Sequence, residues 1–374
     1  MKGRAVVVST VGTSLLTHGE HASALGELLR RTANATEADL APGDRRAITD
    51  RVRRVAELLA DAGSAEASRL SAELNGLHRL LGDLQSCKQA ELVHWLVATD
   101  TYQGREAARL VKDYLNARGW TVHLLVCERL STRSRASFTA GIQQLIRWCE
   151  ENLSAYRTAG YRIVFNLVGA FKSLQAYMNT LGMFYADEIV YVFEAEDSPL
   201  IRIPRLPVQL TPDACIEKKP LLFAQMANGK VMSLTELADI PEALLEIDET
   251  GHAILNEWGL FVWERSKHKV LAGPLLNLPR LSYTPAFRRD YDGIRERSER
   301  VRLQEALVQI SELLETNNND LACLRRHPSI LYEDYVRTPG IGHLRVSLAT
   351  RICCEKTGNG LKLLRYGQEE RINP

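Results

Sequence analysis

The sequence predicts an α/β doubly wound, mostly parallel sheet, followed by a small mixed domain and a C-terminal α+β domain. Three observations predict this order. Short β-branched runs alternate with amphipathic helical stretches at the start of the chain, which is typical of a parallel sheet. Prolines then mark a change of composition, and the last part reads as helices followed by strands. We expect the boundaries at residues 1–205, 206–280 and 281–374.

In the first domain, each expected strand is a short apolar run that fits a buried parallel strand. The amphipathic stretches between them predict helices over 47–60, 67–84 and 104–118. The helical segment between about residues 32 and 90 is long for one crossover, so it is either an insertion or a dimer arm. The expected strands are residues 4–9, 92–98, 121–126, 162–166 and 188–193.

The middle domain has helical signals followed by a hairpin signal. Ser233 with Glu236 three residues later predicts a helix start, and residues 243–258 have helical spacing. Residues 260–264 and 270–273 read as a hairpin around a polar tip. Helices followed by a hairpin are the pattern of a winged helix-turn-helix. A linker domain without a nucleic-acid role fits equally well.

The C-terminal domain is expected to begin with helices and to end in an antiparallel sheet. We predict a helix over 285–315, a short helix over 321–326, and strands over 330–336, 343–354 and 361–366.

Composition sets limits on the function. The chain has 374 residues, of which 25% are charged. Its formal net charge is +1, so the overall charge does not indicate nucleic-acid binding. Seven scattered cysteines without a CxxC pair argue against zinc and predict a reduced, cytoplasmic chain. We expect no metal and no cofactor. No apolar run approaches about 20 residues, so no membrane span is expected.

Two glycine-bearing turns carry the strongest signal for a ligand. Each follows an expected strand and leads into an expected helix, which directs backbone N–H groups and a helix N-terminus at one point, where an anion can sit. Lys172 would lie in a first helical turn, where a cation is unfavourable unless an anionic ligand is near. Ordinary helix caps and a solvated lysine are the alternatives. The candidate ligand-binding residues are Ser9, Thr10, Gly12, Thr13, Ser14, Asn166, Gly169, Phe171, Lys172 and Ser173.

Two further segments end at the same expected sheet edge. Asp100 follows the second strand and is a candidate to accept hydrogen bonds from ribose hydroxyls; its alternative role is a helix N-cap. The run 131–135, Ser-Thr-Arg-Ser-Arg, follows the third strand and is a further candidate lining of the same crevice.

The paired turns resemble the CARF domain, the CRISPR-associated Rossmann fold that senses cyclic oligoadenylates. The likeness covers about residues 1–200 and departs at Ala170, where the family motif has a second glycine. It implies a homodimer that binds the ring across its two-fold axis. It also implies a ring-nuclease activity as an option, with Ser9, Thr10 or Lys172 as candidate groups.

A second constellation lies near the C-terminus. Strand alternation would place His343, Arg345 and Arg351 on one face unless a turn intervenes. From residue 321 onward, nine positive side chains stand against five negative ones, which suits contact with RNA phosphates. Solvated strand arginines are the alternative. The candidate catalytic residues are His343, Arg345, Arg351, Arg365, Tyr366 and Arg371.

This segment resembles the RelE family of ribosome-dependent mRNA interferases over roughly residues 280–374. The resemblance implies RNA cleavage by attack of the 2′-hydroxyl, without a metal. Arg345 and Arg351 would hold the phosphate, and His343 suits proton transfer near neutral pH. The chain departs from the family where Gln368, Glu369 and Glu370 replace a basic residue after the last glycine.

Together the two resemblances predict a CARF–RelE fusion similar to the CRISPR-Cas-associated mRNA interferases. Cyclic oligoadenylate, expected to be cyclic tetra-adenylate, would activate a metal-independent endoribonuclease that cuts mRNA on the ribosome in type III CRISPR antiviral defence. A ligand-responsive DNA-binding transcription regulator is the alternative from another class. A ring nuclease that degrades cyclic oligoadenylate is the third.

Overall fold

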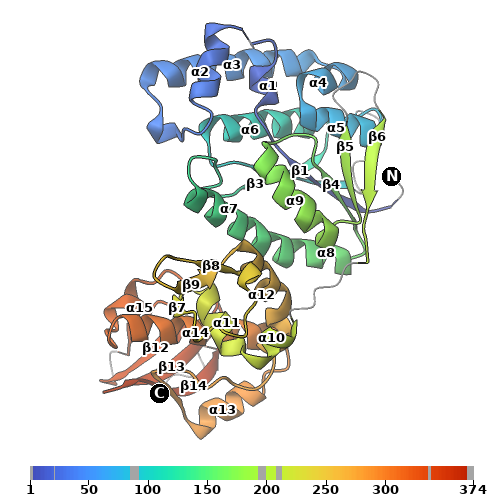
Figure 1. Cartoon of the computed structure of the whole chain (residues 1–374). Helices are drawn as coiled ribbons and strands as arrows, with labels where there is room; N and C mark the ends of the chain where they lie inside the picture. Colours follow the sequence, from blue (N-terminus) through green and yellow to red (C-terminus); the bar gives the residue numbers. More distant parts are fainter. Residues whose placement is uncertain are drawn as a thin grey trace. The chain divides into compact units, whose positions relative to one another are not determined.

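The computed structural model describes residues 3–20, 22–84, 92–192, 199–207, 213–335 and 338–368. It divides into two compact units, residues 1–209 and 210–374, each built around its own β-structure (Figure 1). Among the described helices, none is both long and apolar enough to cross a membrane.

The first unit is a six-stranded sheet in the order β3-β2-β1-β4-β5-β6. All neighbouring strands are parallel except β6, which is antiparallel to β5. The central strand β1 is fully buried, as expected of a parallel strand with helices on both faces. The doubly wound α/β prediction is therefore confirmed, and β6 was not predicted. The strands are β1 (Ala5–Thr10), β2 (Leu92–Ala98), β3 (Thr121–Val126), β4 (Arg162–Asn166), β5 (Glu188–Val192) and β6 (Leu200–Pro204).

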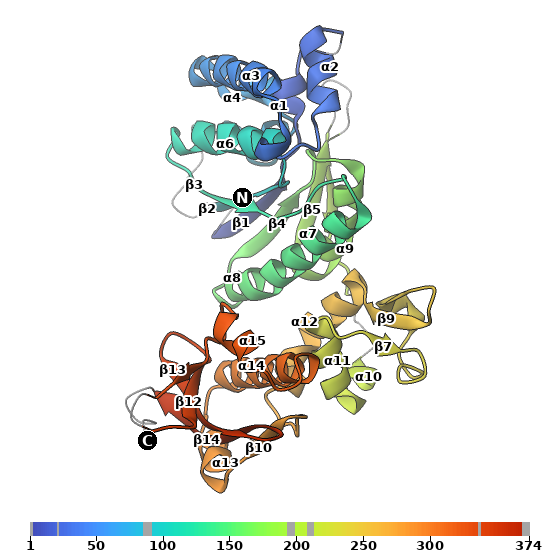
Figure 2. The ribbon, with the colours of Figure 1, turned by 90° about the vertical axis from the view of Figure 1, so that its left-hand side faces the viewer.

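Helices cover both faces of this sheet. Figures 1 and 2 show α3, α4 and α6 on one side of the strands and α7, α8 and α9 on the other. The helices are α1 (Ser14–Thr17), α2 (Ala24–Arg31), α3 (Pro42–Asp61), α4 (Ser64–Leu70), α5 (Ala72–Leu81), α6 (Tyr102–Asn116), α7 (Arg135–Trp148), α8 (Ser154–Thr158) and α9 (Lys172–Tyr185).

The long segment between β1 and β2 belongs to one of these helical layers. Ile48 of α3 and Leu77 of α5 lie in the same hydrophobic core as Val7 of β1. The described residues therefore form an insertion packed on the sheet. The single helix predicted over 67–84 is also wrong. Ser71 breaks it, because its extended backbone and its side chain, which accepts from Leu74 N at 3.2 Å, start a new helix.

The second unit begins with a small sheet of order β7-β9-β8 and three helices. The predicted order of elements here is wrong, because residues 243–258 contain a hairpin and residues 260–270 are helical. Asn256 explains the change: its side chain accepts from Trp258 N and Gly259 N at 2.9 Å and caps the helix that follows. The helix predicted to start at Ser233 is also wrong, because residues 234–239 form turns. The elements are α10 (Asp213–Lys218), α11 (Pro220–Ala227), β7 (Met232–Ser233), β8 (Leu245–Ile247), β9 (His252–Leu255) and α12 (Glu257–Val270). The basis for predicting a winged helix is therefore removed.

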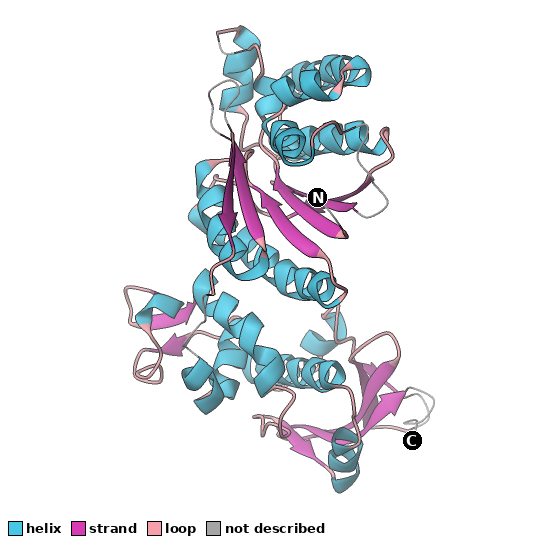
Figure 3. Ribbon diagram, turned by 90° about the vertical axis from the view of Figure 1, so that its right-hand side faces the viewer, coloured by secondary structure: helices cyan, strands magenta, loops and turns pink. Residues whose placement is uncertain are grey.

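The remainder of the second unit is a five-stranded sheet of order β10-β14-β13-β12-β11, and three helices follow β10 in the chain before the other four strands. Figure 3 shows the strands and helices of both units in different colours. The predicted helix 285–315 is interrupted after Asp292. The predicted strand 343–354 is a hairpin, because Ser347 accepts from Ala349 N and Thr350 N and closes a turn. The predicted strand 330–336 is reduced to β11, and residue 336 lies outside the described residues. The elements are β10 (Leu281–Tyr283), α13 (Pro285–Asp292), α14 (Arg297–Thr316), α15 (Ala322–Arg326), β11 (Glu333–Asp334), β12 (Ile341–Arg345), β13 (Thr350–Thr357) and β14 (Gly360–Gln368).

Candidate functional sites

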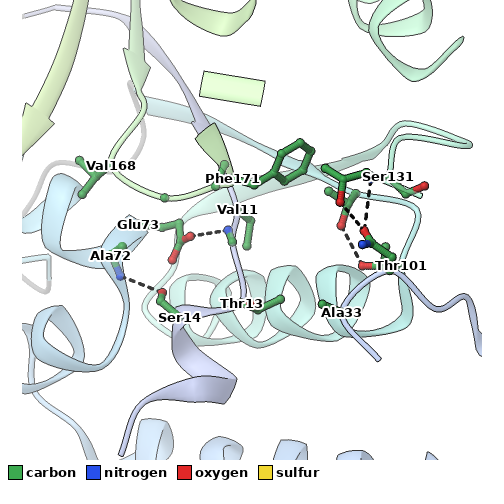
Figure 4. A pocket seen from close by; sticks show the side chains of 16 residues that line it. Val11, Thr13, Ser14, Ala33, Ala72, Glu73, Thr101, Ser131, Val168 and Phe171 are labelled. Atoms are coloured by element: carbon green, nitrogen blue, oxygen red, sulfur yellow. Dashed lines mark hydrogen bonds between the residues drawn. The ribbon is translucent and has the colours of Figure 1, made fainter. Parts of the chain in front are cut away.

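A pocket of about 380 Å³ lies in the first unit, where the segments after β1, β2 and β4 approach the start of α5 (Figure 4). The carboxyl ends of parallel strands are where open α/β sheets bind ligands. The two glycine turns predicted from the sequence both contribute. The lining residues are Val11, Gly12, Thr13, Ser14, Ala33, Asn34, Ala72, Glu73, Thr99, Thr101, Ser131, Thr132, Val168, Gly169, Ala170 and Phe171.

Five of the predicted ligand-binding residues line this pocket: Gly12, Thr13, Ser14, Gly169 and Phe171. From the further candidate run 131–135, Ser131 and Thr132 do so as well. Asn34 Oδ1 accepts from Thr132 N at 3.2 Å and from Thr132 Oγ1 at 2.7 Å. This contact ties the loop after β3 to the insertion at the rim of the pocket.

Three predicted residues are instead fully buried beneath the pocket. Asn166 Nδ2 donates to Ser9 Oγ at 2.9 Å and to the Glu73 carbonyl at 3.0 Å. Ser9 Oγ also bonds His94 Nε2 at 2.8 Å, so a polar chain crosses β2, β1 and β4. Thr10 Oγ1 donates to the Gly169 carbonyl and joins the two turns. Ser9, Thr10 and Asn166 therefore connect the strands and turns beneath the pocket and are not part of its lining.

The other predicted ligand residues also lie outside the pocket lining. Asp100 pairs with Arg105, and its Oδ2 accepts from Arg129 N at 2.7 Å, so it anchors the loop after β3. The N-cap of α6 is Thr101, which bonds Gly104 N at 3.1 Å. Lys172 and Ser173 are exposed in the first turn of α9, next to Phe171, which lines the pocket.

Glu73 is the pocket residue that the sequence reasoning missed. Its carboxylate accepts from Gly12 N at 2.6 Å and from Ser71 Oγ at 2.6 Å. Burial raises the pKa of Glu73, and the hydrogen bonds from Gly12, Ser71 and Ser14 oppose that rise. A helix-start signal existed in Ser-Ala-Glu at residues 71–73, but nothing in the sequence indicated that this helix meets the first turn.

Ala170 has a backbone φ of +122°, a conformation that residues other than glycine rarely adopt. We expect Ala170→Gly to stabilise the first unit by about 1 kcal/mol, since relief of roughly 1–3 kcal/mol of strain exceeds the entropy that glycine adds to the unfolded chain. Calorimetric unfolding checks this. The matched control is Ala140→Gly within α7, where the same change should destabilise the unit by roughly 0.5–1 kcal/mol. If both changes destabilised the unit equally, the backbone of Ala170 would not be strained.

The second candidate site lies on the sheet of the second unit. Arg345 of β12 pairs directly with Arg351 of β13, and His343 lies two residues before Arg345, so the three side chains share one face. Arg345 Nε and His343 Nδ1 are buried and have no hydrogen-bond partner among the described residues. His343 Nε2 lies 3.6 Å from Glu333 Oε2, and its ring lies 5.1 Å from that of Tyr335.

Two of the other predicted catalytic residues already have partners. Arg351 Nη1 donates to the Ser347 carbonyl at 2.6 Å and so holds the turn between β12 and β13. Arg365 pairs with Asp290, Nε to Oδ2 at 2.7 Å. Arg371 lies outside the described residues.

Tyr366 points into the opposite, core-facing side of the sheet. It is buried, and its hydroxyl donates to Glu299 Oε1 at 3.0 Å. Burial raises the pKa of Tyr366 to about 12. Together with Arg365 it lines a hollow of about 810 Å³, whose lining residues do not include His343 or Arg345. Among the five candidates that the structure describes, His343 and Arg345 are the side chains with a buried polar atom that has no hydrogen-bond partner.

Comparison with known proteins bears on the first unit. No curated protein matches the chain. Residues 68–206 match a family model described as CRISPR-associated protein (Cas_APE2256). The matched range includes Glu73 and the turn after β4, and it begins after the turn that contains Gly12. This similarity, on a doubly wound α/β sheet, supports a CRISPR-associated protein with a role in CRISPR defence.

Proposed function

We propose that this chain is a cyclic-oligoadenylate-activated endoribonuclease. Its first unit would bind the ligand as a CARF-like homodimer, with cyclic tetra-adenylate as the expected ring. Its second unit would cleave mRNA on the ribosome as a RelE-like domain. The observation that carries the sensor part is the pocket at the two glycine turns, on a chain whose residues 68–206 match a CRISPR-associated family.

The nuclease part is supported by the pair His343 and Arg345. A buried guanidinium nitrogen without a partner is costly unless a ligand completes its hydrogen bonds. In cleavage, the RNA 2′-oxygen attacks the adjacent phosphorus, and the 5′-oxygen leaves with a proton. Arg345 would stabilise charge on the transition state, and His343 would move a proton. Arg351 would position the turn beside them.

A translation assay tests the proposal. The full chain is mixed with ribosomes translating a defined mRNA, with and without cyclic tetra-adenylate. We expect cleavage only when ligand and ribosome are both present. Intact mRNA in the presence of ligand would sink the nuclease assignment. Ligand-dependent retardation of promoter DNA would then favour a transcription regulator, and loss of the ring without ribosomes would favour a ring nuclease.

Lys172→Ala is expected to weaken cyclic tetra-adenylate binding at least tenfold, because a charge-assisted contact is worth roughly 1.5–3 kcal/mol. Lys172 is exposed in the first turn of α9, and no side chain caps that helix. The ligand-free protein should not lose stability, since a cation at a helix N-terminus is unfavourable. Calorimetric titration measures the affinity, and Arg54→Ala, an exposed cation on α3, is the control. Unchanged affinity in Lys172→Ala would remove this residue from the site.

A further inference from the structure

Glu73 occupies the point at which the two glycine turns would hold an anion. Its carboxylate oxygen Oε1 accepts a hydrogen bond from the backbone N–H of Gly12 on the first turn, with an N–O distance of 2.6 Å. On the second turn it fills the space beside Gly169, where a β-carbon would lie 1.9 Å from Glu73 Oε1. Figure 4 shows this side chain between the two turns. The chain therefore supplies its own anion to the turn on which a phosphate was expected.

The carboxylate is held firmly in this place. Ser71 Oγ donates to its second oxygen at 2.6 Å, and Ser14 also hydrogen-bonds to it. Ser14 Oγ in turn accepts from Ala72 N at 3.3 Å, and the Glu73 carbonyl accepts from Asn166. A phosphate could reach Gly12 N only by displacing a buried group that already has its partners.

The rest of the pocket has no described cationic side chain that would pair with a phosphate. Among its described lining residues there is no Lys, Arg or His, and Glu73 is the one ionisable side chain. The other polar side chains among the described lining residues are hydroxyls and the amide of Asn34. Buried charges are tolerated when paired, so an unpaired phosphate beside a carboxylate would be strongly disfavoured. Its volume of about 380 Å³ suits one nucleoside, not a ring of nucleotides.

We propose that Glu73 is a specificity-determining residue that makes this pocket accept an uncharged nucleoside group and exclude phosphate. The phosphodiesters of a larger ligand would then lie outside the pocket, on the side of the exposed Lys172, whose neighbour Phe171 forms part of the lining. The inference rests on the proposed function only in taking the ligand to be built from nucleosides. It assigns different parts of that ligand to the two turns.

A competition experiment on the full chain tests this. Adenosine is added at millimolar concentration at neutral pH, and ligand-observed NMR measures its binding to the protein. Inorganic phosphate is then added as a competitor. We expect adenosine to bind the wild type and phosphate not to displace it. Glu73→Gln, which keeps the shape and removes the charge, should bind phosphate at least tenfold more tightly and release adenosine to it. Glu106→Gln, a mostly buried glutamate of α6 outside the pocket, should behave as the wild type.

Three results would overturn the inference: displacement of adenosine from the wild type by phosphate, no adenosine binding to the wild type, or a Glu73→Gln protein as resistant to phosphate as the wild type. If Glu73→Gln does not fold, the competition between adenosine and phosphate on the wild type still tests the inference. Cyclic tetra-adenylate is titrated separately. Its failure to bind would count against the proposed function, while the adenosine and phosphate results would still judge Glu73.

Discussion

Arg345→Ala should lower ligand-activated mRNA cleavage by about 10²–10³-fold, the usual effect of removing one preorganised donor to a transition state. Its Nε atom is buried and has no partner among the described residues, so little in the folded protein depends on it. Affinity for cyclic tetra-adenylate should stay unchanged, because Arg345 belongs to the other compact unit. Single-turnover cleavage on ribosomes, with calorimetric titration of the ligand, measures both.

Two control variants make the Arg345 result specific. Arg326→Ala removes an exposed arginine of α15 in the same unit and should leave cleavage within about twofold, because Arg326 is not part of the proposed site. Arg345→Lys keeps the positive charge but loses the planar fork of donors, so it should recover only part of the activity. Full activity in Arg345→Ala would remove the residue from the site. An equal loss in Arg326→Ala would point to charge in general.

The unfolding free energy of the first unit should fall by about 2 kcal/mol between pH 7 and pH 5 because of His94 alone. Burial lowers the pKa of His94 to about 3, from 6.5. The unfolded chain therefore takes up a proton as the pH falls below 6.5, while the folded chain does not until near pH 3. The stability that neutral His94 contributes is complete above pH 6.5 and is lost as the pH falls.

His94→Gln should remove this pH dependence, because glutamine can still bond Ser9 and does not titrate. The quantity to compare is the change in unfolding free energy between the two pH values, measured by calorimetry of the first unit. His18→Gln, an exposed histidine in the same unit, should keep the wild-type slope. The same slope in His94→Gln and wild type would show that His94 is not held neutral in the folded state.

Most of the sheet in the first unit could be predicted, because buried parallel strands are continuous apolar runs. β1, β2, β3 and β4 lie within a residue of their predicted bounds. The predictions failed where one polar side chain decides between two local structures. Ser71 divides a helix in two, and Asn256 starts one where a hairpin was predicted. The hydrophobic periodicity of a sequence does not reveal where a single N-cap residue starts a helix.

The candidate sites show the same limit in another form. Gly12 and Gly169 were found because glycine turns after strands have a sequence pattern, and the structure places both at one pocket. Glu73 was missed because it comes from a helix more than 60 residues after Gly12, brought there by packing alone. Arg351 and Arg365 were correctly placed on strands, but nothing in their spacing revealed that Ser347 and Asp290 already bind them.

The strand order of the two units has a consequence for engineering. Every described strand of the first sheet comes from residues 5–204, and every described strand of the second unit comes from residues 232–368. Neither unit borrows a strand from the other, so recombination of the gene between them would sever no ladder of backbone hydrogen bonds. Such a modular arrangement allows either unit to be joined to a different domain without breaking its own sheet.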